Sequence, residues 1–505
     1  MKLWSWWMMK IIDYVIESTN KYIKQMPKEI RKKNGQFFTS KETALFMASL
    51  FDLSSFSKEI SILDPGAGSG ILTAALIQRI IDTDKIEAIK ITCYETNDDI
   101  LELLNANLSW ISKNTSLKIE YKVIKDNYIT SQTLEYNNML GVSTKPEKYD
   151  VIIGNPPYLK VGKMANEALS MPDICYGSPN LYFLFMEMAS FNLVDNGELV
   201  FIVPRSWTSG AYFKKFREKF LNEVVLKHIH LFVSRDKVFD KESVLQETMI
   251  IKAKKELNKL KNITITTTND NFDFGSKTVF EASYDMVVSG EHKYVFLITD
   301  KEEADTIKKV NEWNDTLPTL GLKMKTGLTV DFRNQEALRN DAEEKAVPLF
   351  YSQHIKDGKV IFPVGKENEY LLTEKKGLLQ ENTNYLFVKR FTAKEEKRRL
   401  QCGIYLAKKF PTYKAISTQN KINFITGLQG LSDCLVYGLY VVLNSTLYDN
   451  YYRILNGSTQ VNATEINSMP IPPLTCIEDM GKELIKLKDM SEENCDEILG
   501  RFIYV

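Results

Sequence analysis

The stretch from Asp150 to Tyr158 joins a buried-strand pattern to side chains that could hold an amine. Three consecutive β-branched residues follow Asp150, as is typical of a parallel strand covered on both faces, and Gly154 permits a tight turn where the strand ends. The four residues after this turn are Asn155, Pro156, Pro157 and Tyr158. In open α/β sheets ligands bind beyond the carboxyl ends of the strands, so these residues should face a crevice.

The chemistry of these four residues suits a substrate with an amino group. Proline has no backbone N–H, so the segment is stiff, and its carbonyl groups and the Asn155 amide oxygen are fixed hydrogen-bond acceptors. Tyr158 adds a flat ring on which a planar base could stack, which is worth about 1–3 kcal/mol. The alternative is a rigid turn with a packed tyrosine and no catalytic role.

A glycine-rich loop precedes this stretch and follows another apolar strand. Residues 61–77 are expected to form a strand, a loop and an apolar helix in succession. The loop residues that could meet a ligand are Asp64, Pro65, Gly66, Ala67 and Gly68. Glycine lets a backbone approach a ligand closely, and the start of the helix supplies N–H groups for an anion such as a carboxylate. The loop lacks the Gly-Lys-Ser/Thr ending of a P-loop, which argues against nucleotide hydrolysis.

Two acidic residues stand at the ends of the next two predicted strands. Glu95 follows residues 89–94 and is placed to bind the ribose hydroxyl groups of an adenosine. Asp126 follows residues 119–125 and could accept hydrogen bonds from an adenine amino group. Either residue alone could equally be a surface carboxylate. Together with the glycine loop, they indicate a pocket for an adenosine-containing ligand.

The elements that must position these residues alternate between strands and helices in the first half of the chain. This alternation predicts an α/β fold with a mixed, mostly parallel sheet, in which residues 224–232 and 247–252 form a hairpin at the sheet edge. At 505 residues the chain exceeds one ordinary core. We therefore expect a first domain over 1–255, a connector over 256–310 and an irregular α+β domain over 311–505.

The expected second domain contains the strongest charge asymmetry of the chain. Lys+Arg 65 equals Asp+Glu 65, so any nucleic-acid contact must be a local patch. Residues 384–421 hold ten basic residues against two acidic ones, with aromatic residues between them, as expected of a surface that binds phosphates and bases. A solvated helix face is the alternative. The candidate DNA contacts are Lys389, Arg390, Lys397, Arg398, Arg399, Lys408 and Lys409.

The cysteines and the hydropathy of the chain favour a reducing, aqueous compartment. The six cysteines form no Cys-x-x-Cys pair and no regular spacing, so we expect neither a metal site nor a disulfide framework. The apolar start, residues 1–10, is far too short to span a membrane. We therefore expect a cytoplasmic protein without a membrane partner.

The order of these motifs resembles the gamma-class adenine-N6 DNA methyltransferases of restriction–modification systems, the TaqI-like group. The motifs in order are Phe38-Thr39, the glycine loop, Glu95, Asp126, Asn155 to Tyr158 and a loop with Phe239, followed by a basic module. The resemblance implies a Rossmann-like methyltransferase domain with S-adenosyl-L-methionine as cofactor. It also implies a target-recognition domain that binds double-stranded DNA, and a cognate restriction endonuclease that acts separately.

The same resemblance assigns roles to individual residues. The cofactor pocket would be lined by Phe38, Thr39, Asp64, Pro65, Gly66, Ala67, Gly68, Glu95, Asp126 and Asn155. The catalytic residues would be Asn155, Pro156, Pro157 and Tyr158. Tyr158 and Phe239 would stack on the two faces of an extruded adenine, although Phe239 without the resemblance would more simply be a core residue.

The acceptors at Asn155 and Pro156 suit methylation of an exocyclic amine. The nitrogen of such an amine is a weak nucleophile because its lone pair is delocalised into the ring, and hydrogen bonds to the two acceptors would localise that pair. The chain has no Pro-Cys dipeptide, which argues against methylation of a cytosine ring carbon. Cytosine N4, an RNA adenine and a protein glutamine stay open as alternative targets, as does nucleic-acid binding by an inactive core.

Overall fold

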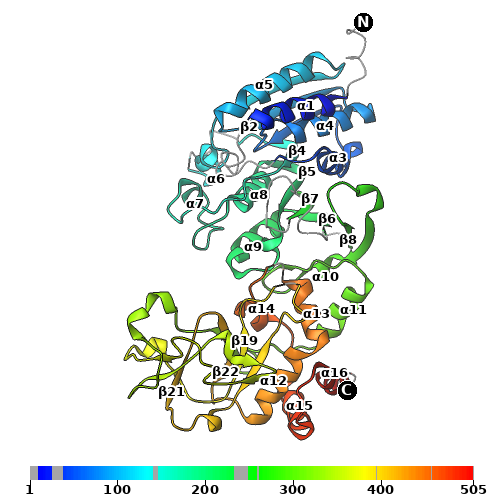
Figure 1. Cartoon of the computed structure of the whole chain (residues 1–505). Helices are drawn as coiled ribbons and strands as arrows, with labels where there is room; N and C mark the ends of the chain where they lie inside the picture. Colours follow the sequence, from blue (N-terminus) through cyan, green and yellow to red (C-terminus); the bar gives the residue numbers. More distant parts are fainter. Residues whose placement is uncertain are drawn as a thin grey trace. The chain divides into compact units, whose positions relative to one another are not determined.

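The computed structural model describes residues 10–25, 38–139, 146–232, 248–256, 258, 261–393, 395–456 and 458–503 in two compact units (Figure 1). The first unit comprises the described residues up to Thr299 except Ser209–Ala211. The second comprises Ser209–Ala211 and the described residues from Asp300 onward. Each unit has its own sheets and its own buried hydrophobic cluster.

The first unit is built on a nine-stranded sheet with the order β3-β2-β1-β4-β5-β7-β6-β8-β9. Its strands are β1 (Glu59–Asp64), β2 (Ala88–Tyr94), β3 (Lys118–Ile124), β4 (Tyr149–Gly154), β5 (Leu193–Pro204), β6 (Val225–Phe232), β7 (Thr248–Lys254), β8 (Asn262–Thr268) and β9 (Thr278–Ser283). The first five strands pair in parallel, whereas β7 is antiparallel to both of its neighbours. This mixed, mostly parallel sheet confirms the predicted α/β, Rossmann-like fold class.

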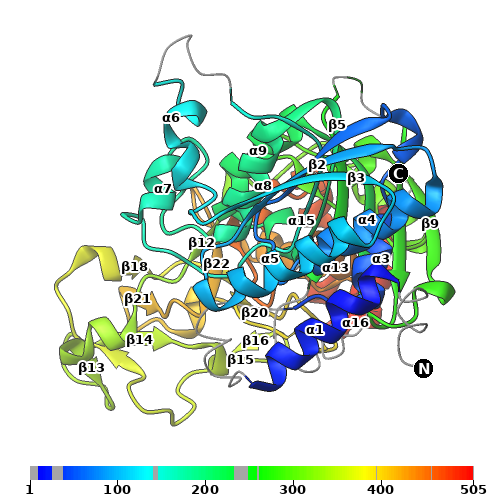
Figure 2. The same cartoon turned by 90° about the horizontal axis from the view of Figure 1, so that it is seen from above.

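Helices surround this sheet. They are α1 (Ile11–Gln25), α3 (Lys41–Ser49), α4 (Ile71–Thr83), α5 (Asp98–Lys113), α6 (Thr133–Tyr136), α7 (Asn166–Ser170), α8 (Leu181–Asn192), α9 (Lys214–Glu223) and α10 (Tyr284–Val287). α1 packs beside α4 and α5 (Figure 2), and α8 packs beside α9. Along β4, Val151 and Ile153 belong to the core that α1, α3 and α4 cover, while Ile152 between them is equally buried. Both faces of the central strand are therefore covered, as its apolar run predicts.

The end of the first unit differs from the sequence expectation in two ways. β6 and β7 pair antiparallel as a hairpin does, but they are not the sheet edge, since β8 pairs with β6 and β9 pairs with β8. Residues 256–310, expected as a connector, thus contribute two strands to this sheet, followed by the short pair β10 (Val288–Ser289) and β11 (Tyr294–Val295). The parallel pairing of β6 with β8 joins strands that local periodicity cannot match to one another.

The second unit combines two sheets with a group of helices. Its strands are β12 (Leu322–Thr326), β13 (Leu338–Arg339), β14 (Val347–Phe350), β15 (Ile355–Lys356), β16 (Lys359–Val360), β17 (Tyr370–Leu371), β18 (Gln380–Glu381), β19 (Tyr385–Lys389), β20 (Cys402–Tyr405), β21 (Ala415–Thr418) and β22 (Ile422–Gly427). They form the sheets β12-β22-β19-β20-β16-β15 and β13-β17-β14-β21-β18. The helices are α11 (Lys301–Val310), α12 (Asp433–Asn444), α13 (Thr446–Leu455), α14 (Ala463–Ser468), α15 (Leu474–Leu487) and α16 (Glu492–Phe502). The short strands among longer helices match the predicted α+β character.

Two glycines bring α12 and α15 into backbone contact. A Cβ atom at Gly438 would lie 1.7 Å from the carbonyl oxygen of Ile477, and a Cβ atom at Gly481 would lie 1.8 Å from that of Cys434. No side chain fits at such distances, because real Cβ atoms do not approach backbone atoms within 3.0 Å. The close packing of these two helices therefore depends on the absence of a side chain at both positions.

Candidate active site

A cavity of about 260 Å³ lies at the carboxyl ends of β1, β2, β3 and β4. Its wall includes the predicted residues Phe38, Thr39, Pro65, Gly66, Ala67, Gly68, Glu95, Asp126, Asn155 and Pro157. These residues come from distant segments of the chain, and the parallel strand order brings them to one edge of the sheet. Asp64, Pro156 and Tyr158 are not part of the cavity wall.

The glycine loop has an open backbone that faces this cavity. Gly68 and Gly70 have φ angles of +54° and +83°, in the left-handed region that favours glycine. Gly70 is the N-cap of α4 and has no side chain, so no side chain caps the first N–H groups of this helix, which begins at the cavity. A Cβ atom at Gly68 would meet nothing within 4 Å. The loop thus leaves room for a ligand beside Gly68, while the N–H groups of Ala67, Gly68 and Gly70 donate within the protein.

Asp64 lies behind the loop, which corrects the expectation that it contacts the cofactor. Its side chain is fully buried, and its Oδ2 accepts a hydrogen bond from the Thr73 hydroxyl of α4 at 2.8 Å. The Gly66 N–H also donates to this carboxyl group, and burial raises its pKa to about 7. Asp64 therefore positions the loop by tying its first residues to the first turn of the helix.

Glu95 holds the loop from the cavity side. Its Oε2 accepts from the Gly68 N–H at 2.9 Å, and its Oε1 accepts from the N–H groups of Thr96 and Asn97 at 2.8 and 2.9 Å. Burial raises the pKa of this carboxyl group. Asp126 is exposed, and both carboxylates retain acceptor capacity for the hydroxyl and amino groups of an adenosine.

The Asn155 amide lies between Thr39 and Tyr158. Its Nδ2 donates to Thr39 Oγ1 at 3.2 Å, and its Oδ1 accepts from the Tyr158 hydroxyl at 2.8 Å. The same hydroxyl lies 3.1 Å from the carbonyl oxygen of Ile202 on β5, and the Tyr158 ring meets Tyr182 edge-on. The contacts hold the amide oxygen in place at the end of β4, so Tyr158 orients Asn155 whether or not it also stacks on a base.

The cavity wall also contains residues that the sequence did not single out. Among them are Ile100 of α5, Tyr128, and Phe185 of α8. The Tyr128 and Phe185 rings have centroids 5.2 Å apart and give the cavity an aromatic side. Every residue from Tyr182 to Ser190 on α8 is buried, so helical periodicity offers no face from which Phe185 could be chosen. Phe239, the expected second stacking residue, lies outside the described residues.

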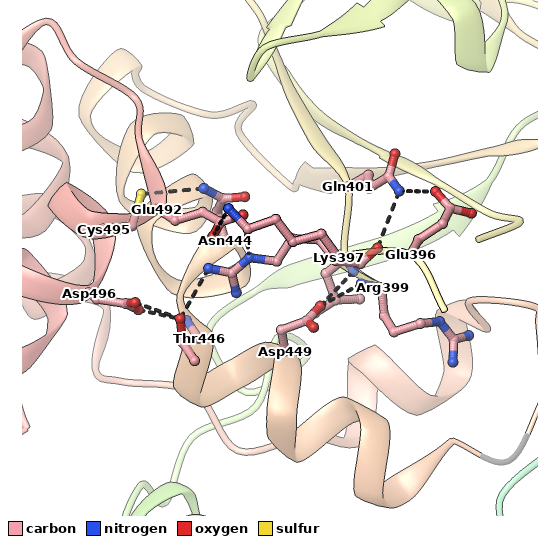
Figure 3. Close-up of polar contacts among 12 residues, drawn as sticks. Glu396, Lys397, Arg399, Gln401, Asn444, Thr446, Asp449, Glu492, Cys495 and Asp496 are labelled. Carbon is pink, nitrogen blue, oxygen red and sulfur yellow. Dashed lines mark hydrogen bonds and ion pairs between the residues drawn. The ribbon is translucent and has the colours of Figure 1, made fainter. Parts of the chain in front are cut away.

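Two of the predicted DNA-contacting arginines are buried in the second unit. Arg399 is fully buried, and its backbone N–H donates to Asp449 Oδ1 at 2.8 Å (Figure 3). Its guanidinium donates to the Ser458 carbonyl at 2.8 Å. Arg398 pairs with Glu492 of α16 at 2.9 Å. Both guanidinium groups are buried and donate to partners inside the unit, which corrects the expectation that they bind phosphates.

The other predicted basic residues are at least partly accessible. Lys397 is exposed and shares the Glu492 carboxylate at 3.0 Å (Figure 3), and Lys408 pairs with Asp433. Lys409 is exposed, whereas Lys389 and Arg390 are half-buried. These five positions stay candidates for contact with DNA.

The remaining features of the chain concern its cysteines and its hydropathy. All six cysteines are free thiols, so the fold contains no disulfide. Within the described ranges, no helix combines the length and the apolar character needed to cross a membrane.

Known proteins resemble this chain over most of its length. The family model Eco57I restriction-modification methylase matches residues 75–239. The type II methyltransferase M.PstI of Providencia stuartii is 32% identical and covers 97% of this chain and 96% of its own. M.BsuBI of Bacillus subtilis, also a type II methyltransferase, is 33% identical and covers 90% of each chain.

A solved structure shares the fold. The type IIL restriction–modification enzyme MmeI, determined in complex with DNA, matches 95% of this chain and 74% of its own with a TM-score of 0.55 at 13% identity. The sequence matches to M.PstI and M.BsuBI show more than a shared fold, since they extend over nearly the whole of both chains. The chain therefore belongs to the type II methyltransferases of restriction–modification systems, and its cofactor is S-adenosyl-L-methionine.

Proposed function

We propose that this protein is a gamma-class, TaqI-like enzyme that methylates the N6 amine of adenine at a specific site in double-stranded DNA. The main support is the Asn155 amide, whose oxygen is held at the end of β4 beside a cavity walled by the glycine loop and Glu95. A fixed acceptor at this place suits an amine that must be oriented toward a bound methyl donor.

In this proposal each part of the cofactor has its own residues in the cavity wall. S-adenosyl-L-methionine, when bound, supplies an electrophilic methyl group. The glycine loop and Thr39 would receive its carboxylate end, Glu95 its ribose hydroxyls and Asp126 its adenine amino group. The aromatic side formed by Tyr128 and Phe185 offers the apolar surface that a purine ring needs.

The catalytic residues, Asn155 to Tyr158, would act on the amine by hydrogen bonding alone. The Asn155 oxygen and the Pro156 carbonyl would accept the two N6 hydrogens, which localises the nitrogen lone pair. No strong base is required beforehand, because the methylated amine becomes acidic and can lose its proton afterwards. The target adenine would reach these acceptors by leaving the duplex, with Tyr158 and Phe239 stacking on its two faces.

The second unit would recognise the DNA sequence. In this proposal the first unit, which extends to Thr299, holds the methyltransferase function, and residues 311–505 of the second unit hold the target recognition. The accessible residues among the predicted DNA contacts, Lys389, Arg390, Lys397, Lys408 and Lys409, support contact with phosphates. The structure of the similar enzyme MmeI was determined in complex with DNA. A cognate restriction endonuclease acting separately and a cytoplasmic location complete the proposal, in keeping with the free cysteines.

Replacement of the acceptor tests this mechanism directly. Asn155→Ala should lower methyl transfer to duplex DNA by at least about 100-fold while cofactor affinity stays within a few-fold, because the amide acts on the amine. Transfer is measured with radiolabelled S-adenosyl-L-methionine, and cofactor affinity by calorimetry. Asn105→Ala, at an exposed position of α5, is the matched control. Near-normal turnover in the Asn155 variant would refute the mechanism.

Sequencing DNA from an expressing host tests the target base. Modified adenines in one recurrent motif are the expected result. Cytosine N4 offers the same kind of amine, so methylated cytosines would retain the mechanism and refute the adenine assignment. Transfer to RNA or to a glutamine side chain, with none to duplex DNA, would refute the DNA target.

A further inference from the structure

Two exposed phenylalanines in the second unit each lie beside an arginine. Phe391 is 51% exposed and Phe332 is 67% exposed. The Arg390 guanidinium lies 5.6 Å from the centroid of the Phe391 ring, and that of Arg333 lies 5.4 Å from the Phe332 ring. Phenylalanine rings so exposed bury little apolar area within their own fold, and the adjacent guanidinium groups provide stacking surfaces and positive charge.

Hydrogen bonds anchor both pairs to one turn between β21 and β22. The Asn420 N–H donates to the Thr329 carbonyl at 2.9 Å, three residues before Phe332. The Asn420 carbonyl accepts from Arg390 Nη1 at 2.9 Å, and the Arg390 N–H donates to the Lys421 carbonyl at 2.9 Å. The turn with the exposed Lys421 thus bonds to two loops that are distant in sequence, one with Arg390 and Phe391 and one that continues to Phe332 and Arg333.

A fourth segment makes the loop with Phe391 rigid. The Val461 N–H donates to the Arg390 carbonyl at 2.7 Å, and the Thr392 N–H donates to the Thr459 carbonyl at 3.2 Å. With the Gln460 amide turned so that its oxygen faces Arg390, that oxygen accepts from Nε at 3.0 Å and from Nη2 at 2.5 Å. The Phe391 ring is therefore presented by a fixed backbone and beside a fixed guanidinium, which lowers the entropy lost on binding.

We infer that Phe332, Arg333, Arg390, Phe391 and Lys421, here called the Arg–Phe surface, contact the bases and backbone of the target duplex. Phe391 packs against an exposed or partly unstacked base step, and Lys421 neutralises a phosphate. The inference rests on the proposed function and specifies which part of the second unit meets the DNA. Asp331, next to Phe332 in the chain, carries a negative charge that would repel a phosphate. Its Oδ1 accepts a hydrogen bond from the Phe332 N–H at 3.0 Å.

The salt dependence of DNA binding separates the packing of phenylalanine on bases from the contact of lysine with a phosphate. The full chain is titrated with a duplex that contains the motif methylated in the host, at several salt concentrations. Phe391→Ala should weaken binding roughly tenfold at every salt concentration without changing the salt slope, because phenylalanine has no charge. Phe391→Trp should restore binding. Lys421→Gln should reduce the slope of log affinity against log salt concentration by about 1, the value for one phosphate contact.

Leu428 provides the matched apolar control. It is 94% exposed and follows β22, at the opposite end of that strand from Lys421. Leu428→Ala should leave both the affinity and the salt slope unchanged. Phe332→Ala should weaken binding as Phe391→Ala does, and sequencing of host DNA should show methylation outside the original motif in one or both variants.

The outcomes distinguish this inference from the proposed function. If the unchanged chain neither binds nor methylates duplex DNA, the proposed function fails and this inference with it. If the unchanged chain methylates DNA and both phenylalanine variants bind and select their sites as it does, only this inference is overturned. Loss of self-association on gel filtration with unchanged DNA binding would also overturn it, since the surface would then bind protein.

Discussion

At the scale of single residues, burial decides what a charged group does. Asp64 and Arg399 were both expected to touch a ligand, and both are fully buried and hold other parts of the fold in place. A count of charges along the sequence cannot show which of them point inward. The residues that stay accessible, such as Asp126 and Lys409, are the ones for which the sequence expectation still stands.

Asp64→Asn is expected to flatten the pH dependence of stability. Burial raises the pKa of Asp64 in the folded chain to about 7, so between about pH 4 and pH 7 the folded chain holds a proton that the unfolded chain has lost. The free energy of unfolding contributed by this group therefore falls as the pH rises through that window. Asparagine retains an acceptor for Thr73 but cannot ionise. Urea unfolding from pH 5 to 8 should show the variant gaining stability relative to the unchanged chain, and parallel profiles would contradict this.

Arg399→Met is expected to destabilise the second unit rather than to weaken contact with phosphates. Removing the guanidinium leaves the Ser458 carbonyl without its 2.8 Å donor, at a cost of about 1–3 kcal/mol. Lys409→Met, at an exposed position, should change stability by less than about 0.5 kcal/mol. Urea unfolding measures both. A normal unfolding midpoint for the Arg399 variant, combined with a lower salt slope of DNA binding, would contradict this prediction and show that Arg399 contacts DNA.

At the scale of elements, the contact between α12 and α15 gives a sharp prediction. Gly438→Ala would place a Cβ atom 1.7 Å from a backbone oxygen, so the helices must separate, and we expect a loss of at least about 3 kcal/mol. Gly500→Ala is the matched control, because a Cβ atom there meets nothing within 4 Å and alanine favours the helix by about 1 kcal/mol. Thermal unfolding of the two variants should therefore shift in opposite directions. Equal midpoints would contradict the packing described.

The elements also show how far the sequence could predict the structure. Apolar runs and the residues after them predicted β1, β2, β4 and the loop segments at their ends, because burial on both faces imposes a local pattern. The continuation of the sheet by β8 and β9 was not predicted, since strand pairing is non-local. Phe185 was missed for a related reason, because α8 is buried on all sides and presents no polar face.

At the scale of the whole molecule, the two units should respond differently to the cofactor. At 100 times its dissociation constant, S-adenosyl-L-methionine should add about 2.7 kcal/mol to the unfolding free energy of the unit that binds it. The cavity belongs entirely to the first unit, so Asn155→Ala and Gly438→Ala should both retain this gain. Calorimetry with and without cofactor measures it. Loss of the gain in the Gly438 variant would show that cofactor binding depends on the second unit.

The motif order along the chain predicted the residues of the cavity wall better than it predicted which basic side chains are accessible. The cavity residues sit at strand ends, which sequence patterns locate well. The Arg–Phe surface instead combines residues around positions 332, 390 and 421, which share no pattern and meet only through the fold. Recognition surfaces of this kind become visible only when exposure and hydrogen bonding are known for each side chain.

The turn at Asn420 has a consequence for how specificity can change over evolutionary time. Most of the bonds that hold the loops around it join main-chain atoms, as between Asn420 and Thr329 or between Val461 and Arg390. A substitution at Phe391 or Lys421 would replace a displayed side chain and keep these bonds. A lineage could thus acquire a new modification pattern through a few replacements, while the sheet that holds Asn155 stayed as it was.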